Sequence, residues 1–412
     1  MSLPASMPAD LVELIGQRVL AGDMLDYVRF RAVCPHWRSS TISPRGRGIT
    51  DPRFHPRRWM MLPDGHGLHL RDGRKRFLNL DTGVFVRPRV PLLEDHSILC
   101  PVDGLLLLQR QSGDQDNNIC LLHPFTGDVA RFPPITCHTI TLGSNPSGMH
   151  YYLLPGSVTA SLSISAKGVP MMMMVLSCTS RVLFATTKDK QWSFSSWSFS
   201  TDETYILSLY ETSISSQGKL YMVRNFVYTG EVQILRIDPP HEEMLGLPSL
   251  KIIPVCTSRI RNPFGLVEYD SEILLVAFMG VYRIADLILG RIIPLTSIGD
   301  NALLMGFEKS QGVIGWSLSV SVSIKAMPTI KGDTIIRNHP PSGKALGEYH
   351  LNRSSLLPRV ERCVKYDGHG FCTCSTVHLI NHMYGVCHCA VNRNLGQMGR
   401  KRRTVGDYVV PR

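Results

Sequence analysis

Residues 77–87, Phe77-Leu-Asn-Leu-Asp-Thr-Gly-Val-Phe-Val-Arg87, place short apolar runs on either side of an Asp-Thr-Gly sequence. This pattern predicts two strands joined by a tight hairpin, because Gly83 can adopt the positive φ angle that such a turn requires. Residues 120–134 repeat the order, with Thr126-Gly127 in place of Thr82-Gly83. The repeat indicates that hairpins build this part of the chain.

Further hairpins are predicted at residues 181–194, 219–237 and 272–284. After residue 56, short apolar runs are separated by Gly, Pro, Asp and Asn, which is typical of a β-rich domain. The hairpins recur about every 40 to 60 residues, and several strands in a unit of that length are typical of β-propeller blades. A pair of β-sandwiches built from similar hairpins is the alternative fold.

Residues 7–38 show helical periodicity instead, and they begin with signals for a helix start. Pro8 suits a first helical turn because its missing N–H is not needed there, and Asp10 complements the positive end of the helix dipole. The apolar stripe of this first helix falls on Leu11, Leu14, Ile15 and Val19.

Two more helices are predicted before residue 40. Gly22-Asp23 ends the first helix, and Asp23 is a candidate N-cap for a second helix with apolar residues Leu25, Val28 and Ala32. Pro35 cannot continue that helix, so the chain restarts as a third short turn carrying Trp37 and Arg38. A unit of about 40 residues buries too little surface to be stable alone and needs a partner surface.

This helical segment closely resembles an F-box. The likeness lies in Met7-Pro8-Ala9-Asp10-Leu11, Ile15, Leu25, Phe30-Arg31, Val33-Cys34 and Trp37-Arg38. In that family the helices bind the adaptor subunit of a cullin-RING ubiquitin ligase called SCF. The resemblance implies adaptor contacts at Pro8, Leu11, Ile15, Val19, Leu25, Phe30, Val33, Cys34, Trp37 and Arg38. The alternative is a helical cap that packs on the chain's own C-terminal domain through the same apolar residues.

Four later segments resemble the KIB-type β-propeller, a domain that follows the F-box in many plant proteins. They are residues 102–108, 122–129, 181–186 and 325–335. The likeness runs from about residue 53 to about residue 351, and in parts to residue 388. Together the two resemblances imply a substrate-recognition subunit of an SCF-type E3 ubiquitin ligase. Its F-box would bind the adaptor and, through it, cullin, while the propeller would bind an unidentified target protein.

We therefore expect a multidomain chain, with a small all-α F-box module followed by an all-β domain that is a β-propeller. A chain of 412 residues is too long for one small core. The expected divisions are an F-box module at 1–45, a basic linker with the first strands at 46–76, the propeller at 77–390 and a basic, disordered tail at 391–412.

The apolar runs, the cysteines and the charge argue against a membrane protein, a secreted protein and a nucleic-acid-binding protein. No run approaches the roughly 18 apolar residues of a membrane span. The first residues lack a basic region followed by an apolar stretch, so secretion is not expected. The cysteines before residue 260 have no framework spacing, which is typical of reduced, buried thiols in the cytosol or nucleus. The net charge of +11 favours acidic partners, but the basic clusters are not interleaved with aromatic residues, so nucleic acid is not an expected partner.

The sequence lacks three common catalytic motifs. There is no Gly-x-x-x-x-Gly-Lys phosphate loop, no His-Glu-x-x-His and no Gly-x-Ser-x-Gly. We therefore expect no enzyme activity, no catalytic residues and no cofactor. In the SCF arrangement a receptor acts through proximity, by raising the concentration of target lysines near a ubiquitin-loaded enzyme.

The C-terminal region supports an alternative function. Soft metal ligands gather at Cys372, Cys374, His378, His382, Cys387 and Cys389. Cys-x-Cys is a poor chelating spacing, and a closing propeller strand accounts for the same residues, so no metal site is expected. The alternative is a zinc- or charge-mediated nucleic-acid-binding or regulatory protein. Residues 399–403, Gly-Arg-Lys-Arg-Arg, resemble a nuclear localisation signal, and the expected location is the nucleus, the cytoplasm or both.

Overall fold

The structure is a computed structural model of the 412-residue chain. It describes residues 7–61, 73–110, 118–135, 158–176, 181–196, 212–225, 232–240, 248–255, 260, 263–277, 280–305, 309–310, 313–314, 319–327, 330–338 and 346–351. The C-terminal cysteine and histidine residues and the basic run at 399–403 lie outside these residues. The chain divides into two compact units, Met1–Met60 with Pro88–Leu295, and Met61–Arg87 with Thr296–Arg412.

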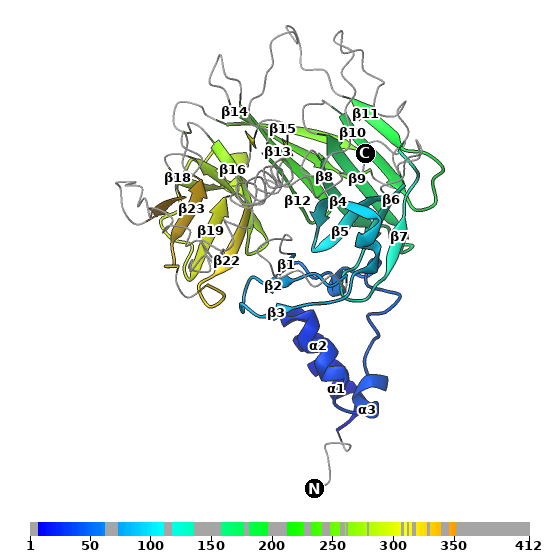
Figure 1. Ribbon diagram of the computed structural model, residues 1–412. Coiled ribbons are helices and arrows are strands. Elements are labelled where there is room, and N and C mark those ends of the chain that lie inside the picture. The colour runs from blue at the N-terminus through cyan, green and yellow to red at the C-terminus, as the bar shows by residue number, and fades with distance from the viewer. Residues whose placement is uncertain are drawn as a thin grey trace, which may run out of the picture. The chain divides into compact units, whose positions relative to one another are not determined.

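The first unit begins with helices and continues with antiparallel sheets (Figure 1). The helices are α1 (Ala9–Gly22), α2 (Met24–Arg31), α3 (Pro35–Ser39) and α5 (Ile284–Ile288), and the 3-10 turns are η1 (Pro52–Phe54) and η2 (Pro91–Glu94). The first sheet contains β4 (His96–Val102), β5 (Leu105–Arg110), β6 (Ile119–Leu122) and β7 (Val129–Arg131). The second contains β8 (Val158–Ile164), β9 (Pro170–Leu176), β10 (Arg181–Thr186) and β11 (Ser193–Ser196).

The third sheet contains β12 (Thr212–Ser216), β13 (Lys219–Asn225), β14 (Val232–Asp238) and β15 (Ser249–Val255), and the fourth contains β16 (Pro263–Tyr269), β17 (Glu272–Ala277) and β18 (Gly280–Arg283). In each sheet, strands consecutive in the chain pair antiparallel. The first strands of successive sheets contact one another, β4 with β8, β8 with β12 and β12 with β16. This is the radial order of β-propeller blades.

Strand β9 shows how the sheets share their cores. Met172 and Met174 pack between the first and second sheets, whereas Met173 and Val175 pack between the second and third. Because successive side chains of a strand point to opposite faces, a strand buried on both faces needs an uninterrupted apolar run. The sequence Met171-Met-Met-Met-Val175 meets that requirement.

The second unit contains the hairpin of β2 (Phe77–Asn79) and β3 (Phe85–Val86), preceded at the boundary of the units by β1 (Trp59–Met61). Its main sheet has the order β22-β19-β23-β24, formed by Ser319–Ser323, Asn301–Met305, Thr334–Asn338 and Leu346–His350. Here β19 and β23 run parallel, unlike the strands of the first unit. A two-stranded sheet joins β20 (Lys309–Ser310) to β21 (Val313–Ile314).

The hairpins predicted at 77–87 and 120–134 are both present, and their turns share one design. Gly83 and Gly127 have φ angles of 74° and 77°. In the first turn, Asn79 Oδ1 accepts hydrogen bonds from the backbone N–H groups of Asp81 and Thr82. In the second, His123 Nδ1 accepts from those of Phe125 and Thr126. A side-chain acceptor four residues before each glycine therefore holds the turn.

His123 must be neutral to hold its turn. Its Nε2 donates to the carbonyl oxygen of Phe54 at 3.0 Å, so Nδ1 carries the lone pair that accepts the two backbone N–H groups. The side chain is fully buried, and burial is the main reason that its pKa is lowered from 6.5. Protonation would add a hydrogen at Nδ1, where it would face the backbone N–H groups of Phe125 and Thr126 and break both hydrogen bonds.

Replacing Met174 by alanine is expected to lower the free energy of unfolding by about 2 to 5 kcal/mol, since this fully buried side chain would leave a cavity. Met171→Ala is the matched control, because Met171 lies in the same strand but is only half-buried. Denaturant titration of both variants tests this prediction, and equal losses would contradict it.

Acid should destabilise the protein through His123. A lowered pKa in the folded state means that the stabilising contribution is complete above the unfolded pKa of about 6.5 and is lost as the pH falls toward the folded pKa. His123→Asn keeps a turn acceptor of the kind that Asn79 supplies and removes this titration. Unfolding free energies should therefore fall less steeply below pH 6.5 in the variant; parallel profiles for the two proteins would refute the assignment.

Candidate functional site

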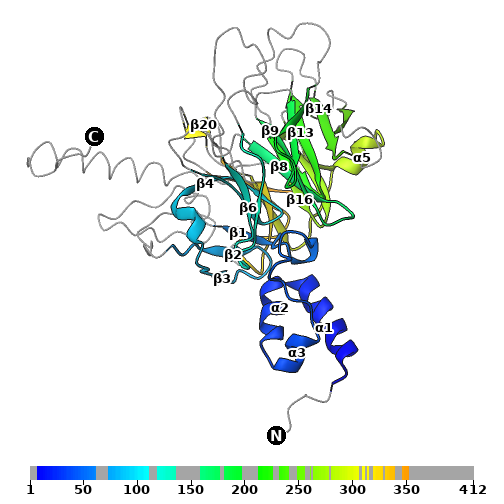
Figure 2. The same cartoon turned by 90° about the vertical axis from the view of Figure 1, so that its right-hand side faces the viewer.

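The helices α1, α2 and α3 form one small module at the start of the first unit (Figure 2). Its buried side is built from Val12, Gly16, Met24 and Tyr27. A Cβ atom at Gly16 would lie 2.9 Å from Thr41 Cγ2 and 3.4 Å from each of the Phe30 and Tyr27 rings. Glycine weakens a helix interior by about 1 kcal/mol relative to alanine. Here it allows α1 to lie close to Thr41 as well as to α2.

The large apolar side chains on the other side of the module are exposed. Leu11, Leu14 and Ile15 of α1 keep 46%, 50% and 38% of their surface accessible, and they share one helix face. Val28 and Val33, at 42% and 52%, are exposed as well. A helical cap that packs on the chain's own domain would bury these side chains. Because they are exposed, they do not pack against the rest of the first unit.

The residues predicted to contact an adaptor fall into two groups. Pro8, Leu11, Ile15, Val33 and Arg38 are exposed, whereas Val19, Leu25, Phe30, Cys34 and Trp37 are half-buried. Leu14 and Val28 belong to the exposed group but were not among the predicted contacts, although both lie in the predicted apolar stripes. Helical spacing was the signal that could have included them.

The half-buried residues hold the module together. The rings of Phe30 and Trp37 lie 4.3 Å apart between centroids. Cys34 Sγ accepts a hydrogen bond from the backbone N–H of Trp37 at 3.4 Å, which caps α3. Pro35 occupies the first turn of α3, as predicted. Trp37 and Cys34 thus have structural roles beside any role in binding.

Asp23 attaches the module to the rest of the first unit. Its Oδ1 accepts from the backbone N–H groups of Leu25 and Asp26 and caps α2, as predicted. Its Oδ2 accepts from Trp59 Nε1 at 2.7 Å. The Trp59 ring packs edge-on against Phe125, 5.3 Å away, in the turn that follows β6. One carboxylate therefore joins the second helix to the first sheet.

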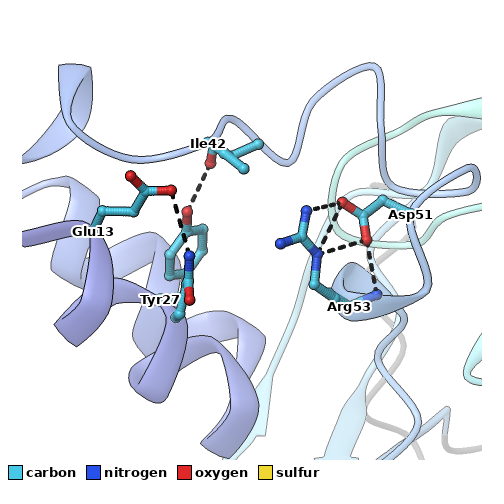
Figure 3. Close-up of polar contacts among 6 residues, drawn as sticks. Glu13, Tyr27, Ile42, Asp51 and Arg53 are labelled. Carbon is cyan, nitrogen blue, oxygen red and sulfur yellow. Dashed lines mark hydrogen bonds and ion pairs between the residues drawn. The ribbon is translucent and has the colours of Figure 1, made fainter. Parts of the chain in front are cut away.

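The segment between the helices and β1 is anchored along its length. Asp128 accepts hydrogen bonds from the backbone N–H groups of Gly46 and Gly48 at 2.9 and 2.8 Å. The Tyr27 hydroxyl donates to the Ile42 carbonyl oxygen at 2.8 Å (Figure 3). In the same figure Arg53 and Asp51 form an ion pair of 2.6 Å. The hydrogen bond from Arg53 is the main reason that the pKa of Asp51 is lowered.

Other kinds of site receive no support from the described residues. Within the part of the chain that the structure describes, no three His, Cys, Asp or Glu side chains are grouped so that they could hold a metal ion. Cys100 and Cys120 are buried free thiols, and burial raises their pKa to about 12 and about 11. No helix in the described ranges is long and apolar enough to span a membrane.

Two of the solved structures that match the chain share little of its sequence. The WD40 domain of SCAP from fission yeast is 11% identical over 76% of this chain and 71% of its own, with a TM-score of 0.31. A putative 6-phosphogluconolactonase from Bacteroides uniformis is 13% identical over 70% of this chain and 74% of its own, with a TM-score of 0.28. No curated protein matches the chain.

A family match covers nearly all the strands of both units. Residues 77–348, more than half of the chain, match the family described as KIB1-4 beta-propeller. The match begins after the helical module and confirms the KIB-type propeller that the sequence predicted. It indicates a domain for protein–protein interaction. The chain belongs to the KIB1-4 beta-propeller family.

Proposed function

We propose that this protein is the substrate-recognition subunit of an SCF-type E3 ubiquitin ligase. The helical module would bind the adaptor subunit as an F-box, and the propeller would bind the target protein. The observation that carries the proposal is the exposure of Leu11, Leu14, Ile15, Val28 and Val33 on a module that is otherwise packed and capped.

Covering these side chains would favour binding appreciably. Full burial of a leucine, isoleucine or valine side chain is worth about 1.5 to 3 kcal/mol, so a half-exposed one has about 1 kcal/mol left to gain. Five such residues can supply a stable interface once the loss of translational and rotational freedom is offset. The adaptor of a cullin-RING ligase is the partner that the F-box-like sequence of this module suggests.

The anchored segment suits a receptor that works through proximity. The contacts of Asp23 with Trp59, and of Asp128 with Gly46 and Gly48, fix the module on the first sheet. A target held by the propeller would then be presented to a ubiquitin-loaded enzyme from one direction, which raises the effective concentration of its lysines. In this proposal the chain itself catalyses no reaction, and it acts in the nucleus, the cytoplasm or both.

The double variant Leu11→Ala/Ile15→Ala is expected to weaken binding of the purified adaptor subunit about tenfold or more, because both side chains would be buried in the interface. Folding should be unaffected, since both are exposed and alanine favours a helix. Gln17→Ala, an exposed change on another side of α1, is the matched control and should bind normally. Unchanged affinity of the folded double variant would rule out this interface.

A second experiment tests the complete role. Affinity co-purification from cell extract would compare the full chain with the full-length Leu11→Ala/Ile15→Ala variant. The adaptor and cullin should be retained only by the original chain, while proteins bound to the propeller should be retained by both. If neither chain retains a cullin, the propeller acts outside ubiquitin transfer.

A further inference from the structure

The third sheet carries two rows of polar side chains across β13, β14 and β15, which lie side by side (Figure 1). In one row Tyr221 lies opposite Arg236, and Arg236 lies opposite Lys251. In the other, Asp238 lies opposite Ser249, and Lys219 approaches Asp238 from β13. Directly opposite residues share a face of a sheet, as do residues two apart in a strand. All six side chains therefore lie on the same face.

The cations of these rows outnumber the acid. Asp238 is the single carboxylate within ion-pair distance of Lys219, Arg236 or Lys251 among the described residues. We call these three cations the basic array. Its net charge with Asp238 is +2. Like charges directly opposite in a sheet are destabilising, and Arg236 faces Lys251 in this way. A further anion at this place would relieve that repulsion.

Arg236 and Asp238 already satisfy each other. Arg236 Nε and Nη2 donate to the two carboxylate oxygens, each at 2.9 Å, and the carboxylate is 10% exposed. Burial acts to raise the pKa of Asp238, but this hydrogen bonding and the three cations outweigh it and lower the pKa. The carboxylate is thus ionised. A guanidinium has five N–H donors in all, so Arg236 keeps Nη1 for another acceptor.

The two lysines retain their donors. Lys219 Nζ lies 3.8 Å from the Asp238 carboxylate and Lys251 Nζ lies 3.6 Å from it, both beyond hydrogen-bond length. Their side chains are 34% and 58% exposed. Tyr221, half-buried beside Arg236, adds a hydroxyl to the same face. Ammonium, guanidinium and phenol donors therefore converge around one region of the sheet.

The array is held on a rigid support. The next row on the same face consists of Val223, Ile234 and Ile253, which are paired across the same three strands. They are 1%, 0% and 8% exposed and belong to the core between the third and fourth sheets. Groups fixed by such packing lose little further freedom when a ligand binds, which favours affinity.

We propose that Lys219, Arg236 and Lys251 form a binding site for an acidic segment of a protein partner. The chemistry that fits is an anion with several acceptor oxygens, either neighbouring carboxylates or a phosphate on the segment. Phosphate and carboxylate are the groups that arginine forks and lysine ammonium groups recognise. Only the further assignment of this segment to a protein to be ubiquitinated rests on the function proposed above.

The test uses the purified full chain and fluorescence anisotropy with labelled peptides of equal length. One is hexaglutamate, one contains a single phosphoserine among serine and glycine residues, and one is hexaglutamine. The array variant is Lys219→Gln/Lys251→Gln, which keeps most of each aliphatic stem. The matched control is Lys188→Gln/Lys190→Gln, which removes the same charge from exposed positions near β10. Lys251→Arg keeps a positive charge at residue 251 and therefore tests whether binding depends on that charge.

We expect an anionic peptide to bind the original chain and the Lys188/Lys190 variant equally, and to bind the array variant about tenfold or more weakly. Lys251→Arg should bind nearly as well as the original. The tighter of the two anionic peptides identifies carboxylate or phosphate as the preferred source. Equal weakening of both double variants would reduce the effect to the net charge of the chain, and no binding of either anionic peptide would overturn the proposal.

Measuring adaptor binding by the same variants tests the basic array independently of the receptor function proposed above. The array variant should bind the adaptor normally, since the exposed face of α1 is unchanged. Loss of peptide binding with normal adaptor binding supports the site, whatever the outcome of the cullin experiment. Loss of both would mean that the substitutions disturb the fold, and Lys251→Arg alone would then decide: if it too fails to bind an anionic peptide, the proposal is wrong.

Discussion

Burial of the same strand on both faces is the constraint from which the rest of the first unit follows. In β9, Met172 and Met174 fill one core while Met173 and Val175 fill the next, so a shift of one residue would exchange the two sets. The register of each sheet is thereby tied to that of its neighbours. That register in turn brings Arg236 opposite Lys251 and presents Phe125, in the turn after β6, to the Trp59 ring that binds Asp23.

Local rules predicted local structure well. The turns at Gly83 and Gly127, the cap at Asp23 and the restart at Pro35 each depend on a few consecutive residues, and all are present. The sheet order β22-β19-β23-β24 was not predictable in this way, because a parallel pair such as β19 and β23 leaves no turn signal in the sequence. The expected domain boundaries remain predictions.

The site shows a similar division. Periodicity identified which residues of α1 share a face, but it could not show that the smaller residues Val12 and Gly16 face inward while Leu11 and Ile15 face outward. Hydrophobicity alone favours the larger side chains for the core. Thr41 reverses that choice at Gly16, because a Cβ atom there would lie 2.9 Å from Thr41 Cγ2, with the Tyr27 and Phe30 rings next at 3.4 Å. The contacts of Asp23 with Trp59 and of Asp128 with Gly46 depend on long-range folding and left no pattern in the sequence.

The two oxygens of Asp23 limit which amino acids can replace it during evolution. Serine, threonine, asparagine and aspartate are usually interchangeable as helix caps. Here serine and threonine have one oxygen and cannot serve both α2 and Trp59. Asparagine would turn an amide N–H₂ toward the indole N–H, donor against donor. Of the four usual capping residues, only aspartate can therefore make both sets of contacts at residue 23. A substitution there would require a matching change at residue 59.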